Sequence, residues 1–222
     1  MRIIDAAADL LLNGCCPGCG HPGRGVCQSC AAAIRAGTVG ARDRQGIELP
    51  LWSAGAYLHP LPRVISQAKD HHRWDAIALL ATRLALAVAG LADATDLVGP
   101  VHLVPFPSRS GAVRDRGLDF TDRLARLAAR HLRAVGLPTT VHPTLRYTRQ
   151  VRDQGGLTSQ DRLSNLDRSL EVFRDPPGHP AILIDDVVTT GASLREGVRA
   201  LRAAGAGPVG LATVAATVLR HS

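Results

Sequence analysis

The feature that most constrains this chain is the stretch AILIDDVVTTGAS at residues 181–193. It begins with an apolar run, which predicts a buried strand over residues 181–185. Two adjacent carboxylates, Asp185 and Asp186, come next, and a short loop of threonine and glycine leads into an amphipathic helix predicted over residues 193–204. Because the end of such a strand opens onto a crevice, this order predicts a site for a sugar phosphate.

Each part of this stretch has a chemistry that suits a phosphorylated sugar. The two aspartates can accept hydrogen bonds from vicinal hydroxyls. The loop can turn its amides and hydroxyls onto a phosphate, and the N-terminus of the next helix adds positive potential. That loop consists of Val187, Val188, Thr189, Thr190, Gly191, Ala192 and Ser193. The alternative is an ordinary strand–helix turn in which Ser193 and Glu196 form a capping box, but this leaves the two acids unexplained.

Size and charge limit the classes of protein that the chain can belong to. Its 222 residues, 45% of them hydrophobic, are enough for one α/β domain with a small appendage. No apolar run approaches the ~20 residues of a membrane span, and Asp5 and Asp9 interrupt the N-terminal segment, so we expect a cytoplasmic protein with no membrane span. The net charge of +7 suits anionic partners, either phosphates or nucleic acid. Of the 26 basic residues only Lys69 is a lysine.

All five cysteines lie within the first thirty residues. Cys16 and Cys19 form one CxxC pair, and Cys27 and Cys30 form a second. Two such knuckles can wrap a tetrahedral Zn²⁺ with four thiolates, so we predict a structural zinc site. A pair of disulfides and an iron–sulfur cluster are the alternatives, and Cys15 could replace Cys16 as a ligand.

The remaining pattern alternates strands with helices, which predicts an α/β fold with a parallel sheet. We predict strands over residues 52–57, 101–106, 144–148, 170–173, 181–185 and 208–219. The predicted helices cover residues 1–14, 61–69, 76–90 (ended by Gly90), 122–135 (capped by Thr121) and 193–204. Residues 41–50 read as a polar linker.

Two polar loops extend the predicted site. The first directly follows the 101–106 strand and offers Ser108, Arg109, Arg114 and Arg116, whose guanidinium groups match phosphate oxygens. The second, residues 146–166, is of the kind that closes over active sites and excludes water. The alternatives are a basic surface loop and a plain exposed connection.

Four segments in order resemble the ComF family: CPGC…CQSC, VPFP…RDRGLD, QGGLTSQDRLSNL and LIDDVVTTGASL. The last is similar to the phosphoribosyl-pyrophosphate (PRPP) signature of type I phosphoribosyltransferases. The resemblance implies a zinc element at residues 1–45 and a type I phosphoribosyltransferase fold at 46–222. It implies a glycosyltransferase that moves phosphoribose from PRPP, which carries Mg²⁺, to an unidentified nitrogen acceptor and releases pyrophosphate. The family is also associated with competence and DNA uptake, so the alternative is a non-catalytic PRPP-binding protein that handles single-stranded DNA, with the competence machinery as partner.

The resemblance also implies roles for single residues. Asp185 and Asp186 would be the catalytic pair that holds the ribose hydroxyls, and Val187–Ser193 would hold the 5-phosphate. The pyrophosphate site would comprise Lys69, Ser108, Arg109, Arg114 and Arg116, and the flexible loop would contribute Arg149, Gln154, Arg162 and Asn165. The chain departs from the family where RGFNQ is usual and where an aromatic residue and a glycine usually follow the lysine. Both departures concern the acceptor and pyrophosphate sides.

Overall fold

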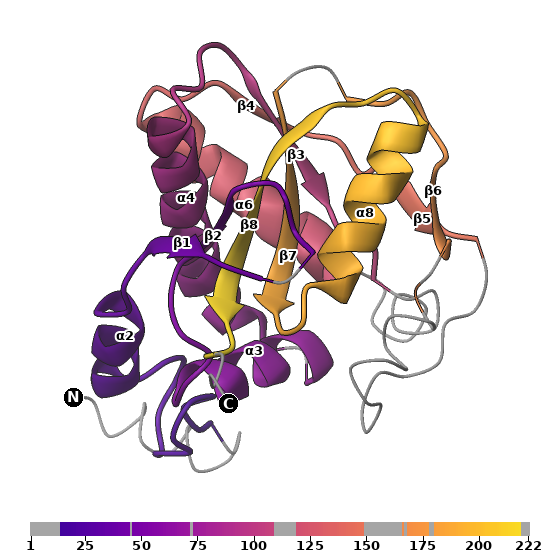
Figure 1. Cartoon of the computed structure of the whole chain (residues 1–222). Coiled ribbons are helices and arrows are strands. Elements are labelled where there is room, and N and C mark those ends of the chain that lie inside the picture. Colours follow the sequence, from indigo (N-terminus) through magenta and orange to yellow (C-terminus); the bar gives the residue numbers. More distant parts are fainter. Residues whose placement is uncertain are drawn as a thin grey trace.

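A central six-stranded sheet organises the computed structural model (Figure 1), which describes residues 14–44, 46–71, 73–108, 119–148, 166, 168–177 and 180–218. The strand order is β1-β2-β8-β7-β3-β4, and every pair is parallel except β1 with β2. The predicted α/β class is therefore confirmed. The strands are β1 (Gly40–Arg42), β2 (Leu51–Ser53), β3 (Val101–Pro105), β4 (Thr139–Val141), β7 (Ala181–Val188) and β8 (Pro208–Ala216).

Two of the predicted strands lie outside the central sheet. β5 (Leu145–Tyr147) and β6 (Leu170–Val172) pair with each other in an antiparallel sheet of their own. Their cross-strand partners include Arg146 and Glu171, whose side chains form an ion pair of 2.7 Å. The small sheet lies beside α8 (Ala192–Ala203).

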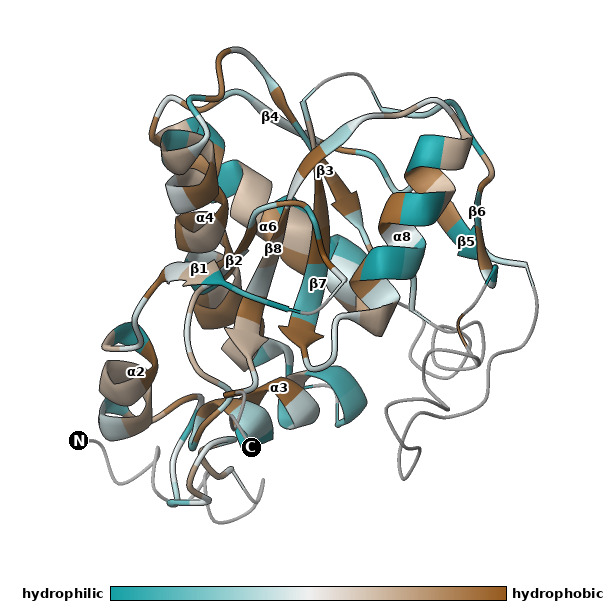
Figure 2. Cartoon of the chain, viewed as in Figure 1, coloured by the Kyte–Doolittle hydropathy of each residue, from teal (hydrophilic) through white to brown (hydrophobic). Residues whose placement is uncertain are grey.

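Helices cover both faces of the central sheet. The alternation of strand side chains explains this arrangement: Ile182 and Ile184 join the core formed with α4 and α6, whereas Leu183 joins the core on the α8 side. Figure 2 shows the hydrophobic strands between these layers. The other helices are α2 (Gln28–Arg35), α3 (Leu61–Asp70), the short η1 (Trp74–Ala76), α4 (Ile77–Ala94) and α6 (Phe120–Ala134). α3 runs across the carboxyl ends of β7 and β8 (Figure 1).

The N-terminal part of the chain contributes to the central sheet. β1 pairs with β2 at the edge of that sheet, although residues 41–50 were expected to be only a linker. The proposed division of the chain at residue 45 stays a prediction. Residues 1–13, which include most of the predicted first helix, lie outside the described residues.

The longest helix, α4, corrects two expectations. Trp74–Ala94 is long and apolar enough to cross a membrane by length and composition, which we did not expect, but 61% of its most apolar window is buried in the fold. Such burial is that of a core helix, although some of its side chains, among them Ala78 and Leu86, stay exposed. Gly90 does not end this helix. A Cβ there would lie 2.5 Å from the ring of Trp52, so the glycine instead allows β2 to approach.

Replacing Gly90 with alanine therefore tests this close approach. Helix propensity alone would stabilise the variant by about 1 kcal/mol. We expect the clash with Trp52 to outweigh this, so that Gly90→Ala lowers the free energy of unfolding in urea by about 1–3 kcal/mol. Ala78→Gly, at an exposed position of the same helix, measures the propensity effect by itself. A more stable Gly90→Ala protein would contradict the packing described here.

Candidate functional site

The acidic pair lies within β7 rather than after it. The strand was expected to end at Asp185 but continues to Val188, because β8 keeps pairing alongside it, from Asp185 opposite Thr213 to Val188 opposite Ala216. The two acids nevertheless have different surroundings. Asp186 is buried, with 6% of its surface exposed, and Asp185 is half-buried.

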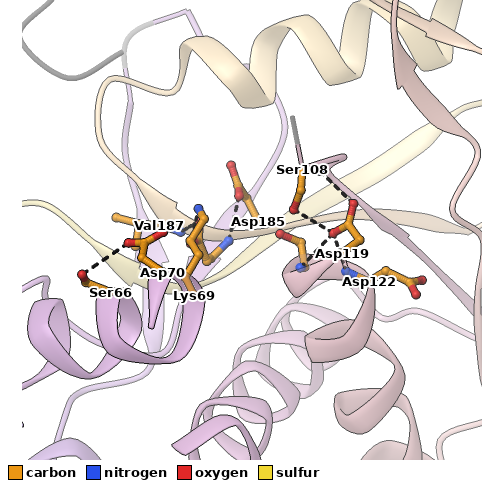
Figure 3. Close-up of polar contacts among 10 residues, drawn as sticks. Ser66, Lys69, Asp70, Ser108, Asp119, Asp122, Asp185 and Val187 are labelled. Carbon is orange, nitrogen blue, oxygen red and sulfur yellow. Dashed lines mark hydrogen bonds and ion pairs between the residues drawn. The ribbon is translucent and has the colours of Figure 1, made fainter. Parts of the chain in front are cut away.

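The sole lysine of the chain contacts this pair. Lys69, near the end of α3, donates a hydrogen bond from Nζ to Oδ2 of Asp186 over 2.7 Å (Figure 3). The other carboxylate oxygen of Asp186 accepts the amide of Val187 at 3.0 Å, and Asp185 accepts the amide of Asp186 at 2.8 Å. The structure thus brings together three residues that the sequence analysis assigned to one site, although 117 positions separate the lysine from its partner.

Lys69 and burial shift the pKa values of the two carboxyl groups in opposite directions. Burial alone would raise the pKa of Asp186, but the charge of Lys69 and its hydrogen bond outweigh burial, so this pKa lies below its ordinary value. Burial raises the pKa of Asp185 well above its ordinary value, and the negative charge of Asp186 adds to the effect. The charge of Asp186 in turn raises the pKa of Lys69. One acid is therefore held ionised, and the other takes up a proton more readily than a solvated aspartate.

The loop after β7 presents unpaired donors. Within the ranges that the structure describes, the amides of Thr189, Thr190 and Gly191 donate to no acceptor. Gly191 has a φ of +81° and is the N-cap of α8, which begins at Ala192. Three such amides at a helix N-terminus form a concave site for an anion.

The capping-box alternative for this turn is wrong. Ser193 lies inside α8, the N-cap residue is Gly191, and the amide of Ala192 donates to the hydroxyl of Thr190 at 3.4 Å. Glu196 is buried and points elsewhere: its carboxylate accepts the amide of Leu170 at 2.9 Å and pairs with Arg199 at 2.7 Å. The serine is therefore left for another role.

Arg44 is a residue of this site that the sequence analysis missed. Its guanidinium is buried, with 5% exposed, and donates to the carbonyl of Thr189 at 2.8 Å, to that of Asp43 at 2.6 Å and to that of Thr217. Arg44 thus links the loop after β7 to the residue that follows β8. No local pattern marks it, because it stands in a polar stretch between two short strands.

Ser108 lies at the end of β3, on the same sheet edge as the acidic pair (Figure 3). Its amide and hydroxyl both donate to the carboxylate of Asp119, at 2.8 and 3.0 Å. Asp119 also accepts the amides of Thr121 and Asp122, so it caps α6, not Thr121 as expected. The other predicted residues of the two polar loops, namely Arg109, Arg114, Arg116, Arg149, Gln154, Arg162 and Asn165, lie outside the described residues.

The four predicted metal ligands lie together at the N-terminal end of the chain. The sulfur atoms of Cys16, Cys19, Cys27 and Cys30 all lie within 4.8 Å of one another. Four thiolates around Zn²⁺ at ~2.3 Å stand about 3.8 Å apart, and the Cys19–Cys27 sulfur distance is 3.7 Å. The cluster could therefore bind a metal such as zinc. Cys15 is not one of these four; its carbonyl accepts a hydrogen bond from Arg73 at 2.7 Å.

Backbone amides favour thiolates at Cys16 and Cys27, whereas burial raises the pKa of Cys30. The amides of Gly18 and Cys27 point at the sulfur of Cys16, at 3.4 and 3.3 Å. A hydrogen bond from the Cys30 amide, with a further one from the Ser29 hydroxyl, lowers the pKa of Cys27 to about 6. Since thiolates rather than thiols bind metals, these amides suit the metal-bound state.

Comparisons with known proteins agree with this geometry. Residues 112–219, which contain the acidic pair and the loop after it, match the family model described as phosphoribosyl transferase domain. This part of the chain, a little under half of it, is therefore similar to a phosphoribosyl transferase domain. Comparison with curated proteins gave no match.

Three solved structures with similarity to the chain are phosphoribosyltransferases by their descriptions. Adenine phosphoribosyltransferase from Saccharomyces cerevisiae is 16% identical over 86% of this chain and 89% of that chain, with a TM-score of 0.38. The HGPRT-ase from Leishmania tarentolae is 16% identical over 67% and 79%, with a TM-score of 0.34. Orotate phosphoribosyltransferase from Aeropyrum pernix is 20% identical over 71% and 64%, with a TM-score of 0.31.

The spare cysteine offers a matched test of the metal site. We expect the purified protein to carry one zinc ion per chain by elemental analysis, and Cys19→Ser to lose it because three thiolates bind far more weakly than four. Cys15→Ser should keep a full equivalent, since Cys15 lies outside the cluster. Iron in place of zinc, or loss of metal from the Cys15 variant, would contradict this assignment.

Proposed function

We propose that this protein binds PRPP at Asp185–Ser193 and transfers its phosphoribose to a nitrogen acceptor, with release of pyrophosphate. The observation that carries the proposal is the set of three amides at Thr189–Gly191, which donate to no acceptor in the described part of the chain and stand beside the acidic pair. A phosphate needs such donors, and a ribose needs the acids next to them. The match of this segment to the phosphoribosyl transferase domain supports the same function.

The groups of PRPP can be assigned to the parts of this site. The 5-phosphate would accept hydrogen bonds from the amides of Thr189–Gly191 and from the hydroxyls of Thr189, Thr190 and Ser193. The ribose hydroxyls would donate to Asp185, which is half-buried, and to Asp186. The carboxylate of Asp186 already accepts hydrogen bonds from Lys69 and from the amide of Val187, and its remaining lone pairs would accept hydrogen bonds from the ribose hydroxyls. A carboxylate oxygen has two lone pairs, so the internal bonds of Asp186 do not prevent this.

The reaction would break the bond from C1 of the ribose to the pyrophosphate oxygen and form a bond from C1 to the acceptor nitrogen. The two acids would steady positive charge that develops on the ring, and Lys69, held next to them, would face the departing pyrophosphate. Mg²⁺ bound to PRPP would neutralise further charge on the leaving group. Arg109, Arg114 and Arg116 stay predicted partners of the pyrophosphate, and Arg149, Gln154, Arg162 and Asn165 stay predicted residues of a closing loop.

A second candidate function is single-stranded DNA handling without turnover, in line with the resemblance to the ComF family. The observation in its favour is Phe173, which is 37% exposed and lies beside the guanidinium groups of Arg146 and Arg174, 5.3 and 4.9 Å from the ring centre. Aromatic and guanidinium faces stack with bases, and the net charge of +7 attracts the backbone. Steeply salt-dependent DNA binding without pyrophosphate release, across a panel of bases and amines, would favour this function.

Neutralising the acidic pair tests the proposed site. We expect PRPP with Mg²⁺ to bind the unaltered protein in calorimetry. The double variant Asp185→Asn, Asp186→Asn should bind about a hundredfold more weakly or worse, because hydrogen bonds to charged acceptors contribute about 1.5–3 kcal/mol each. Asp70→Asn is the matched control, since it removes an exposed carboxylate beside Lys69 but none from the pair. Unchanged affinity in the double variant would reject the site.

The raised pKa of Asp185 predicts how PRPP affinity depends on pH. An ionised Asp185 accepts two donors, so affinity should fall as the pH drops through its pKa. Lys69 lowers this pKa, so Lys69→Met should move the fall in affinity to higher pH. Calorimetric titrations over a pH series check this, and Asp185→Asn should remove this part of the pH dependence. A shift to lower pH in Lys69→Met would contradict the electrostatic account.

A further inference from the structure

A groove separates α8 from the segment that joins β1 to β2. This segment crosses in front of the sheet to reach α8 (Figure 1), and the groove between them has a volume of about 270 Å³. It lies between α8 and residues 46–49, in front of β8, and Figure 2 shows hydrophilic residues along α8. Its lining consists of Gly46, Ile47, Glu48, Leu49, Arg195, Val198, Arg199, Arg202 and Leu211.

The lining combines an apolar floor with positive charge. The half-buried Leu49 and Val198 provide apolar surface above the buried Leu211, whereas three arginines stand along α8. Their spacing of four and three residues places Arg195, Arg199 and Arg202 on one side of the helix. Glu48 is the only acid in the lining, so the groove carries a net positive charge.

The arginines differ in how firmly they are held. Arg199 pairs with Glu196 at 2.7 Å and donates to the carbonyl of Leu170 at 2.7 Å, so its guanidinium is fixed. Arg202 reaches across the groove to Glu48 at 3.5 Å, and the two side chains are 52% and 81% exposed. Such an exposed ion pair contributes little to stability, so an incoming anion can replace Glu48 as the partner of Arg202.

We propose that this groove binds a small organic anion with a flat apolar body, such as an aromatic phosphate ester or carboxylate. The apolar body would cover Leu49 and Val198, and the anionic group would bind Arg202 in bidentate fashion. An inorganic anion would leave the floor uncovered, and a neutral aromatic compound would leave the positive charge unmatched. Both parts of the ligand are therefore needed, as is usual for small-molecule sites.

The groove lies directly behind the loop after β7. Arg195 donates from Nη1 to the carbonyl of Thr190 at 3.3 Å. Ile47 packs so closely on Gly191 that a Cβ at this glycine would lie 2.6 Å from its Cδ1. A ligand in the groove would thus contact residues that support the proposed phosphate loop, although the binding itself does not depend on the proposed function.

Phenyl phosphate is the probe for a first test. Calorimetry at fixed ionic strength should show that it binds more tightly than inorganic phosphate or benzyl alcohol. Arg202→Gln should weaken its binding about three- to tenfold, and Glu48→Gln should strengthen it, because Glu48 competes for Arg202. Arg130→Gln, an exposed arginine of α6, should have no effect and controls for net charge.

The location of the site is tested separately. A saturating concentration of ribose 5-phosphate, whose phosphate would occupy the amides of the loop after β7, should leave the binding of phenyl phosphate unchanged, and Val198→Asp should abolish this binding. Equal affinity for inorganic phosphate and phenyl phosphate would overturn the proposal, as would binding that the Glu48 and Arg202 variants leave unchanged. Competition by ribose 5-phosphate would place the anion in the PRPP site and would also overturn it.

Discussion

The parallel pairing of β7 with β8 is the constraint on which the site depends. The pairing does not stop at the acidic residues but continues to Val188, and this fixes the backbone of Asp185 and Asp186 as rigidly as that of the core. The loop that follows can then turn within three residues into α8. The acidic pair and the unpaired amides of the loop are therefore neighbours because β8 pairs with β7 as far as Val188.

Lys69 offsets the repulsion between the two adjacent carboxylates of β7. Two adjacent carboxylates at a buried strand end repel each other and are poorly solvated, so both cannot be ionised without a counter-charge. The ammonium group at 2.7 Å from Asp186 supplies it and lowers one pKa, while burial still raises the other. A pair that binds hydroxyls benefits from this difference, because Asp186 stays a charged acceptor while Asp185 takes up a proton more readily.

Local sequence patterns predicted the parts of the molecule that depend on few residues. The apolar run before Asp185, the CxxC knuckles and the helix that carries Lys69 are each readable within about a dozen positions, and the structure contains all of them. The sequence analysis missed contacts between distant segments. Arg44 meets the loop after β7 from 145 positions away, and Gly90 is required by a ring in β2. Neither Arg44 nor Gly90 belongs to a recognisable sequence pattern, because the residues that they contact are brought near only by the tertiary fold.

Distant contacts also join the cysteine cluster to the central sheet and its helices. Arg83, a buried arginine of α4, donates to the carbonyls of Arg35 and Gly37 at the end of α2 and to that of Ala54 after β2. Gly18, within the first knuckle, lies against Pro60, where α3 begins, and α3 carries Lys69. One helix, α3, therefore contacts the first knuckle where it begins and the acidic pair near its end. The position of the lysine that sets the charge of the acidic pair thus depends on packing between the two ends of the chain, which no local pattern in the sequence reveals.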